Sequence, residues 1–189
     1  MLLIDEIEDH HLLCLGFNKA SILDPEHALK LLRAVNSQAE VQLLKADLVA
    51  GPEHLHFAAR NAIYSFKGKR RRSKSLAMEL LLYISCQRQI AKAIKFLGVD
   101  SKDSQIAIVA LSESKAALEE LARDAQSIVG GEPDEDLIEI QSKQRVAKLQ
   151  HAYGITNRAM EAARFEGETD SSVLKQLIIE RSALLDIQD

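Results

Sequence analysis

The chain has 189 residues, a formal net charge of −4 and a hydrophobic fraction of 47%. This size fits one domain with a packed core, and the mixture of both charges along the chain excludes an intrinsically disordered protein. The acidic balance, with a pI of about 5.9, is not that of a protein that binds nucleic acid over its whole surface.

Cysteine usage and the first residues bear on where the protein works. Cys14 and Cys86 are too few for a disulfide framework, so both are expected to be reduced thiols in a cytoplasmic protein. The opening segment MLLIDEIEDHH is short and acidic, unlike a secretory leader. No apolar run approaches the roughly 20 residues that span a bilayer, so no membrane partner is expected.

The first fifty residues predict two strands separated by a helix. Residues 11–17, HLLCLGF, are mostly apolar and are expected to form the first strand. Asp24 and Pro25 open a helix, the one as its cap and the other as its first residue. Residues 41–50, VQLLKADLVA, are expected to form the second strand.

Three helices are expected between residues 52 and 98. The first begins at Gly51-Pro52 and ends at Gly68, and its apolar residues recur with the period of a helix. Its inward face consists of Leu55, Ala58, Ala59, Ala62, Ile63 and Phe66. The second begins near Ser75 and is apolar on nearly every side, so it is expected to lie buried. The third has one apolar face and ends at Gly98.

The second half of the chain predicts a central strand followed mainly by helices. Residues 105–111, QIAIVAL, form a continuous apolar run typical of the middle of a sheet. Residues 114–129 are expected to be helical and residues 136–140, DLIEI, to form a short strand before two more helices. An acidic linker at 165–169 then leads into an amphipathic helix at about 170–187.

This succession of strands and helix pairs indicates an α/β (α+β) fold. We expect a single two-layer domain with a small mixed β-sheet packed by helices, plus a C-terminal helix. The domain is expected to span residues 1–164. Residues 165–189 are expected to form a linker and an amphipathic helix that packs on the domain or on a partner.

No motif in the sequence indicates catalysis or metal binding. It contains no phosphate-binding glycine loop, nucleophile elbow or protein-kinase signature. His54 and His56 are two residues apart on a helix, so their side chains diverge, and His10-His11 has no third ligand nearby. Cys86 lies in a turn without a partner base and is interpreted as a buried thiol. No enzymatic activity, metal or cofactor is therefore expected, and an enzyme with an unrecognised site is the least favoured alternative.

The strongest local feature is the segment KGKRRRSK at residues 67–74, called the basic loop below. It carries six positive charges and no acid, so the remainder of the chain carries −10 within the net charge of −4. The loop precedes a helix N-terminus, whose N–H groups and dipole favour phosphate. A polyanion would therefore be attracted mainly here. A solvated loop or a docking site for an acidic protein fits the charge equally well, and no aromatic residue within the run supports base stacking.

Over nearly its whole length the chain resembles a known family. The resemblance is carried by VQLLKADLVAGPEHLHFAARNAIYSF, SKSLAMELLLYISCQRQIAKAIKFLG, QIAIVAL, YGIT and IIERSALLDIQ, and the second tract is the most specific. These tracts are similar to the small regulatory subunit of the KEOPS complex, the family of the PRPK-binding protein TPRKB, and in particular to archaeal members. Two features depart from the family pattern. Cys86 stands where relatives have glycine or another small residue, and the three consecutive arginines make the loop unusually basic.

The resemblance implies a non-catalytic role in tRNA modification. Members of the family bind the small atypical kinase of KEOPS at its N-terminal lobe and stimulate the complex. They also bind tRNA, with the CCA end as a main point of contact. Other subunits transfer the threonylcarbamoyl group to an adenosine beside the anticodon. The alternative is a protein-only adaptor that binds a kinase without touching RNA.

Two sets of residues are expected to contact these partners. The tRNA contacts are expected at the basic loop, with a weaker candidate in a later turn, and they are Arg70, Arg71, Arg72, Lys74 and Arg88. The kinase contacts are expected on one stripe of the last helix, which Val173 and Leu184 widen, and they are Leu174, Leu177, Ile178 and Leu185. The competing interpretation is that this stripe packs on its own domain.

Overall fold

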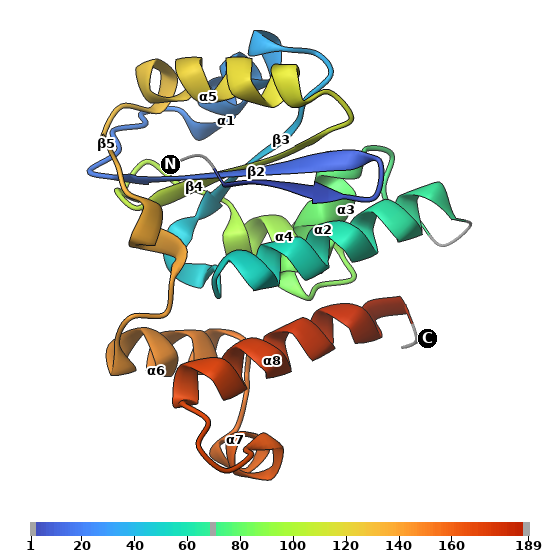
Figure 1. Cartoon of the computed structure of the whole chain (residues 1–189). Helices are drawn as coiled ribbons and strands as arrows, with labels where there is room; N and C mark the ends of the chain where they lie inside the picture. The colour runs from blue at the N-terminus through green and yellow to red at the C-terminus, as the bar shows by residue number, and fades with distance from the viewer. Residues whose placement is uncertain (1–2, 69–70, 187–189) are drawn as a thin grey trace.

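A computed structural model describes residues 3–68 and 71–186, and a single β-sheet lies at its centre (Figure 1). The strand order is β1-β2-β4-β3, and β5 pairs with the end of β2. The strands are β1 (Leu3–Ile7), β2 (His10–Asn18), β3 (Glu40–Lys45), β4 (Ile106–Ser112) and β5 (Glu132–Pro133). Every pairing between these strands is antiparallel.

The α/β class is confirmed, but the expected mixture of parallel and antiparallel strands is wrong. The helical crossover between β2 and β3 makes these two strands point the same way, as it would in a parallel sheet. β4, which comes later in the chain, lies between them and pairs antiparallel with both. The position of a later strand decides the pairing, and the local sequence does not reveal it.

β4 lies in the middle of the sheet, as its apolar run predicts. All seven of its residues are buried. Ile106 and Ile108 point into the apolar cluster on one face of the sheet, and Ala107 and Val109 point into the cluster on the other face. Both faces of β4 are apolar, so both must be covered by other elements.

Helices cover both faces of the sheet, so the domain has three layers where two were expected (Figure 1). One face carries α1 (Pro25–Val35) and α5 (Lys115–Val129). The other carries α2 (Pro52–Lys67), α3 (Leu76–Ser85) and α4 (Ile90–Leu97). The predicted inward face of α2 is confirmed, since its five aliphatic residues are buried and Phe66 packs against the same core.

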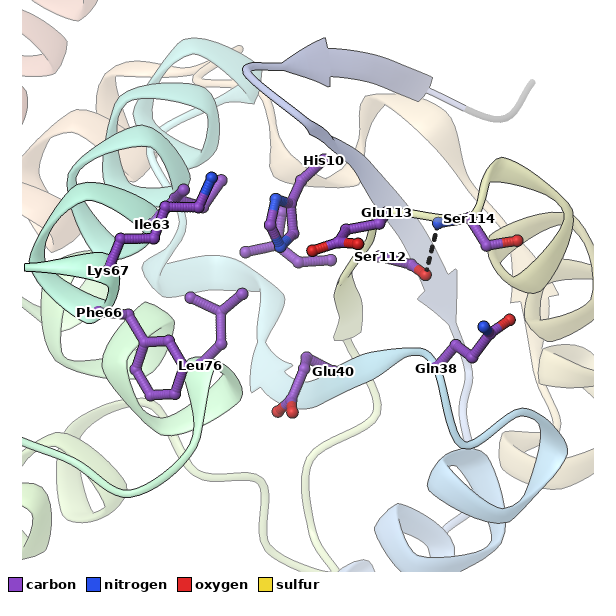
Figure 2. A pocket seen from close by; sticks show the side chains of 11 residues that line it. His10, Gln38, Glu40, Ile63, Phe66, Lys67, Leu76, Ser112, Glu113 and Ser114 are labelled. Carbon is purple, nitrogen blue, oxygen red and sulfur yellow. Dashed lines mark hydrogen bonds between the residues drawn. The ribbon is translucent and has the colours of Figure 1, made fainter.

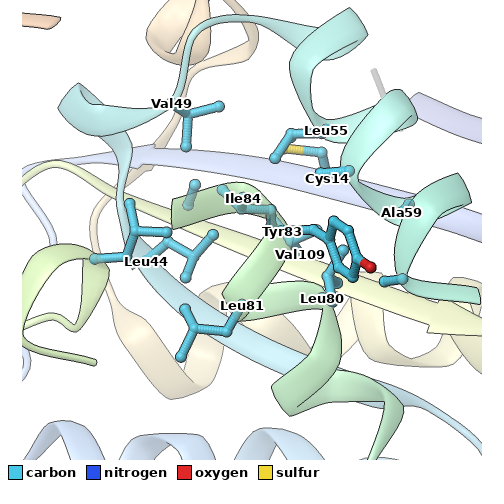
Figure 3. Close-up of a cluster of buried hydrophobic side chains, with 14 of the residues drawn as sticks. Cys14, Leu44, Val49, Leu55, Ala59, Leu80, Leu81, Tyr83, Ile84 and Val109 are labelled. Carbon is cyan, nitrogen blue, oxygen red and sulfur yellow. The ribbon is translucent and has the colours of Figure 1, made fainter. Parts of the chain in front are cut away.

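The helix α3 is buried on nearly every side, as its composition predicts. Nine of its ten residues are buried. Figure 3 shows Leu80, Tyr83 and Ile84 of α3 in one cluster with Val109 of the sheet and Leu55 of α2. This packing holds both ends of α3 in place, with the basic loop at its start and the Cys86 turn at its end.

Three local predictions differ from the structure. The strand expected at 136–140 is instead a 3₁₀ helix, η2 (Glu135–Ile138), because the Asp134 carboxylate accepts a hydrogen bond from the Asp136 N–H at 3.1 Å and closes a turn. The strand expected at 41–50 ends at Lys45 and continues as a 3₁₀ helix, η1 (Ala46–Leu48). The acidic first residues were not expected to be a strand, yet β1 pairs along β2.

The last three helices form an additional group beside α2 (Figure 1). They are α6 (Lys143–Ala152), α7 (Asn157–Ala163) and α8 (Asp170–Ala183), which ends in the 3₁₀ turn η3 (Leu184–Asp186). The predicted C-terminal helix is therefore confirmed. It packs on the domain through an apolar cluster of its own, which α6, α7 and α8 share. None of the helices within the described residues is long and apolar enough to cross a membrane.

Candidate functional site

A buried carboxylate organises the described part of the basic loop. Glu79, in the first turn of α3, is fully buried. Its Oε2 accepts hydrogen bonds from the Arg72 N–H at 3.0 Å and from the N–H and hydroxyl of Ser73, both at 2.9 Å. Its Oε1 accepts a hydrogen bond from the Ser65 hydroxyl at 3.0 Å. One side chain of α3 thus fixes the backbone that leads into α3.

This backbone presents two cations to solvent next to a helix start. Arg71 and Lys74 are exposed, and the Arg71 guanidinium lies 5.8 Å from the ring centroid of Phe66. Ser75 caps α3 by accepting a hydrogen bond from the Met78 N–H at 3.3 Å. The positive end of the α3 dipole therefore adds to the charge of these side chains. The predicted contact Arg70 lies outside the described residues.

Arg72 is a predicted RNA contact that the structure places elsewhere. Its side chain is half-buried and turned inward. Nη2 donates to the Leu185 carbonyl at 2.6 Å, and Nη1 lies 3.5 Å from the Tyr83 hydroxyl. The guanidinium is thereby engaged with the end of the C-terminal helix, so Arg72 does not join Arg71 and Lys74 on the surface.

Arg88 is exposed, but it is not part of the same patch. It follows α3, whereas Lys74 precedes it, and a helix of ten residues is about 15 Å long. Two further exposed lysines, Lys92 and Lys95, follow it in α4. These two lysines were not among the predicted contacts, although their spacing of three residues places both on one side of a helix.

The stripe predicted to contact the kinase lies inside the domain. Leu174 and Ile178 are fully buried, Leu185 is 3% exposed and Leu177 is half-buried. Leu174 and Ile178 pack in the apolar cluster with Leu149 of α6, and Leu177 packs against that cluster. In this arrangement the stripe attaches α8 to its own domain. Its placement does not support direct contact with a kinase.

A buried polar cluster connects α2, α3 and the end of α6. His54 is fully buried; its Nδ1 accepts a hydrogen bond from the Ala50 N–H at 3.2 Å, so Nε2 is the nitrogen that donates to the Ile84 carbonyl at 3.1 Å. The Tyr153 hydroxyl lies 3.0 Å from that carbonyl and 2.9 Å from the Leu48 carbonyl. Burial lowers the pKa of His54 to about 4. Both ring nitrogens have partners, so His54 is not available as a metal ligand.

Cys86 has the properties of a structural thiol. Burial raises its pKa to about 12, so the nucleophilic thiolate does not form near neutral pH. The thiol lies 3.5 Å from the Ile178 carbonyl of α8. The residue caps α3 with a φ of 52°, in the left-handed region that glycine adopts most easily. This conformation agrees with the glycine or other small residue expected at this position in the family that the chain resembles.

A hollow of about 590 Å³ opens beside Lys67, at the start of the basic loop, and two possible metal ligands, His10 and Glu113, line it (Figure 2). Atoms of Asp9, His10 and Glu113 lie within 4.8 Å of one another. Asp9 is already paired, however, with its Oδ2 2.6 Å from the Lys67 ammonium and its Oδ1 2.7 Å from Nδ1 of His10. Lys67, and to a lesser extent His10, lower the pKa of Asp9 to about 2. The ammonium group already supplies the positive charge that a metal would bring, so we interpret the group as an ion pair.

Two comparisons with known proteins identify relatives of this chain. A model of the family described as "Kinase binding protein CGI-121" matches residues 19–186. The regulatory protein Cgi121 of Methanocaldococcus jannaschii is 34% identical over 114 residues, which cover 60% of this chain and 70% of the relative. The family match includes every element from α1 to α8, the basic loop and the buried Glu79 among them, and on this ground the chain belongs to the CGI-121 family of kinase binding proteins.

Proposed function

We propose that the protein is a non-catalytic regulatory subunit that binds a protein kinase. Membership of the CGI-121 family carries this proposal, because the family is described by kinase binding and the relative by a regulatory role. The resemblance to the small KEOPS subunit makes the partner the small atypical kinase of that complex. The chemistry of threonylcarbamoyl transfer to tRNA then belongs to other subunits, and this chain needs no cofactor.

The outer side of α8 is the part of that helix available to such a partner. Gln176, Glu180 and Ala183 are exposed and follow one another at spacings of four and three residues. The apolar residues predicted to bind the kinase would act through them, by holding this side of the helix in position. An association measurement with the purified kinase, comparing wild type with Glu180→Lys/Ala183→Lys, tests this face. Asp124→Lys/Ala116→Lys on α5, across the sheet, is the matched control, because it adds the same positive charge at exposed positions (Figure 1).

We further propose that the basic loop binds tRNA. Exposed Arg71 and Lys74, the N-terminus of α3 and the acidic remainder of the chain support this reading, since they concentrate positive potential at one place. The resemblance adds the CCA end as the main point of contact. Arg88, exposed beyond the other end of α3, is the weaker candidate for a further RNA contact.

The experiment that tests the whole proposal is reconstitution with the kinase and tRNA. Purified protein is expected to associate with the kinase, to shift tRNA in a gel and to show no ATP hydrolysis or threonylcarbamoyl transfer alone. Kinase association without a tRNA shift would instead identify a protein-only adaptor. Activity that persists in the isolated chain after removal of contaminating partners would contradict the non-catalytic assignment.

A further inference from the structure

The basic loop and the end of the chain's last helix are joined at one residue. Arg72 lies in the loop and Leu185 lies in η3, 113 residues later. The Arg72 guanidinium donates to the Leu185 carbonyl at 2.6 Å, a charge-assisted hydrogen bond to one of the carbonyls that a helix end leaves unpaired. Leu185 itself is buried in the core cluster that contains α2 and α3.

The same residue is also the point at which α3 holds the loop. The backbone N–H of Arg72 donates to Glu79, while the Arg72 side chain reaches Leu185 and the Tyr83 hydroxyl. α8 is fixed to this part of α3 by a second bond, from the Ser182 hydroxyl to the Tyr83 carbonyl at 2.9 Å. The loop is thus held from two sides, by Glu79 beneath its backbone and by the end of α8 at its side chain.

These contacts divide the arginines of the loop into two kinds. Arg71 is exposed, and its guanidinium lies 5.8 Å from the ring centroid of Phe66. The Arg72 guanidinium is half-buried and bound to the Leu185 carbonyl, so a phosphate group would have to compete with the end of α8 for it. Charge alone does not distinguish the two residues, since they are adjacent and identical.

We propose that Arg72 is a positioning residue, through which the end of α8 holds the basic loop in the shape that presents Arg71 and Lys74 to RNA. The inference rests on the proposed function of the loop in tRNA binding. The position of the end of α8 and the conformation of the RNA surface are then coupled. A partner that shifts the end of α8 therefore changes the affinity for tRNA without touching the RNA surface.

A double-mutant cycle in the full chain tests this assignment. Leu185→Ser loosens the end of α8 and leaves every cation of the loop in place. Leu184→Ser, a change to the half-buried neighbour in the same turn, is its matched control. We expect Arg72→Ala and Leu185→Ser each to weaken tRNA binding by about tenfold, the effect of losing one hydrogen bond to a charged group. The double variant is expected to bind no more weakly than the weaker-binding single variant, because Arg72→Ala removes the contact that Leu185→Ser loosens.

Two further measurements separate positioning from direct contact. Arg72→Lys keeps the charge but loses the fork geometry, so it is expected to bind tRNA as weakly as Arg72→Ala. The backbone N–H groups of residues 72 and 73 donate hydrogen bonds to Glu79. Their amide protons are expected to exchange faster in Arg72→Ala and Leu185→Ser and at the wild-type rate in Leu184→Ser.

The outcomes that overturn the inference differ from those that overturn the proposed function. If Arg72→Ala weakens binding in the Leu185→Ser background as much as in wild type, Arg72 contacts RNA directly. Unchanged amide exchange in Leu185→Ser, or faster exchange with unchanged tRNA affinity, also removes the positioning role. Unchanged tRNA affinity in Arg71→Ala and Lys74→Ala would instead refute RNA binding by the loop. In that case amide exchange would still report whether the end of α8 holds the loop.

Discussion

The basic loop and α8 meet at Arg72 and Leu185, but they use their residues in opposite ways. In the loop, a buried carboxylate holds the backbone so that charged side chains such as Arg71 and Lys74 face solvent. In α8, the apolar stripe that resembles a docking surface packs on its own domain. A cluster of like charges keeps its segment at the surface, so the location of the segment is predictable from the residues, although the orientation of each side chain is not. An apolar stripe only has to be covered, and its residues do not say by what.

The largest expected effect tests whether the α8 stripe is core. Ile178→Ala should lower the free energy of unfolding of the isolated protein by about 2–5 kcal/mol, because a fully buried aliphatic side chain leaves a cavity. Urea denaturation measures the change. Leu177→Ala, at a half-buried position of the same helix, is the control and should cost less. A change at Ile178 too small to measure would mean that the stripe is a free interface after all.

The polar cluster between α2, α3 and α6 gives the second prediction. Burial holds the pKa of His54 at about 4, below its ordinary value of 6.5, so the unfolded chain takes up the proton first. Stability is therefore complete above pH 6.5 and falls as the pH drops through 6.5 toward 4, by roughly 3 kcal/mol in total. Urea titrations at several pH values measure this loss. His56→Gln should keep the same dependence and His54→Gln should flatten it; equal slopes in both variants would remove His54 as the cause.

The charge of the basic loop gives the third prediction. With three to five phosphates engaged, the logarithm of tRNA affinity should fall with the logarithm of salt at a slope of roughly −2 to −4. Arg71→Ala and Lys74→Ala should each flatten this slope by roughly 0.7 and weaken binding similarly for different tRNAs, since phosphate contacts carry little sequence information. A salt titration measures both effects. Arg123→Ala, at an exposed position of α5, is the control. An identical slope in wild type and all three variants would show that the loop is a solvated segment and not an RNA contact.

The smallest effect is expected at the turn that follows α3. Cys86→Gly relieves a left-handed backbone conformation but loses thiol packing and adds freedom to the unfolded chain, so the free energy of unfolding should change by less than about 1 kcal/mol. Cys86→Val should cost more, because a β-branched side chain is strained at this φ. Thermal and urea denaturation compare the two. Equal losses would show that packing, and not backbone conformation, dominates at this position.

Arg72 marks the limit of reading a site from charge. In the sequence it is the third arginine of a run, and nothing in the run separates it from Arg71. The difference arises because the carbonyl of Leu185, which is 113 residues away, lies beside Arg72 in the folded chain. Arg88, the weaker candidate in a later turn, shows the same limit, since charge does not reveal that it lies beyond the other end of α3.

Local patterns determined the elements whose cause is local. The proline and aspartate that open α1, the inward face of α2 and the apolar run of β4 each specify their structure through caps, helical period or burial on both faces. The strand order of the sheet was not predictable in this way, because β4 enters between β2 and β3 only after three further helices. A pairing between distant segments leaves no local signature.

The same distinction between local and distant causes applies to the candidate site. The sequence by itself determined that six positive charges gather at residues 67–74. Only the tertiary structure decided which of them face solvent, because that depends on Glu79 and Leu185, partners that the fold brings to the loop from two other helical segments.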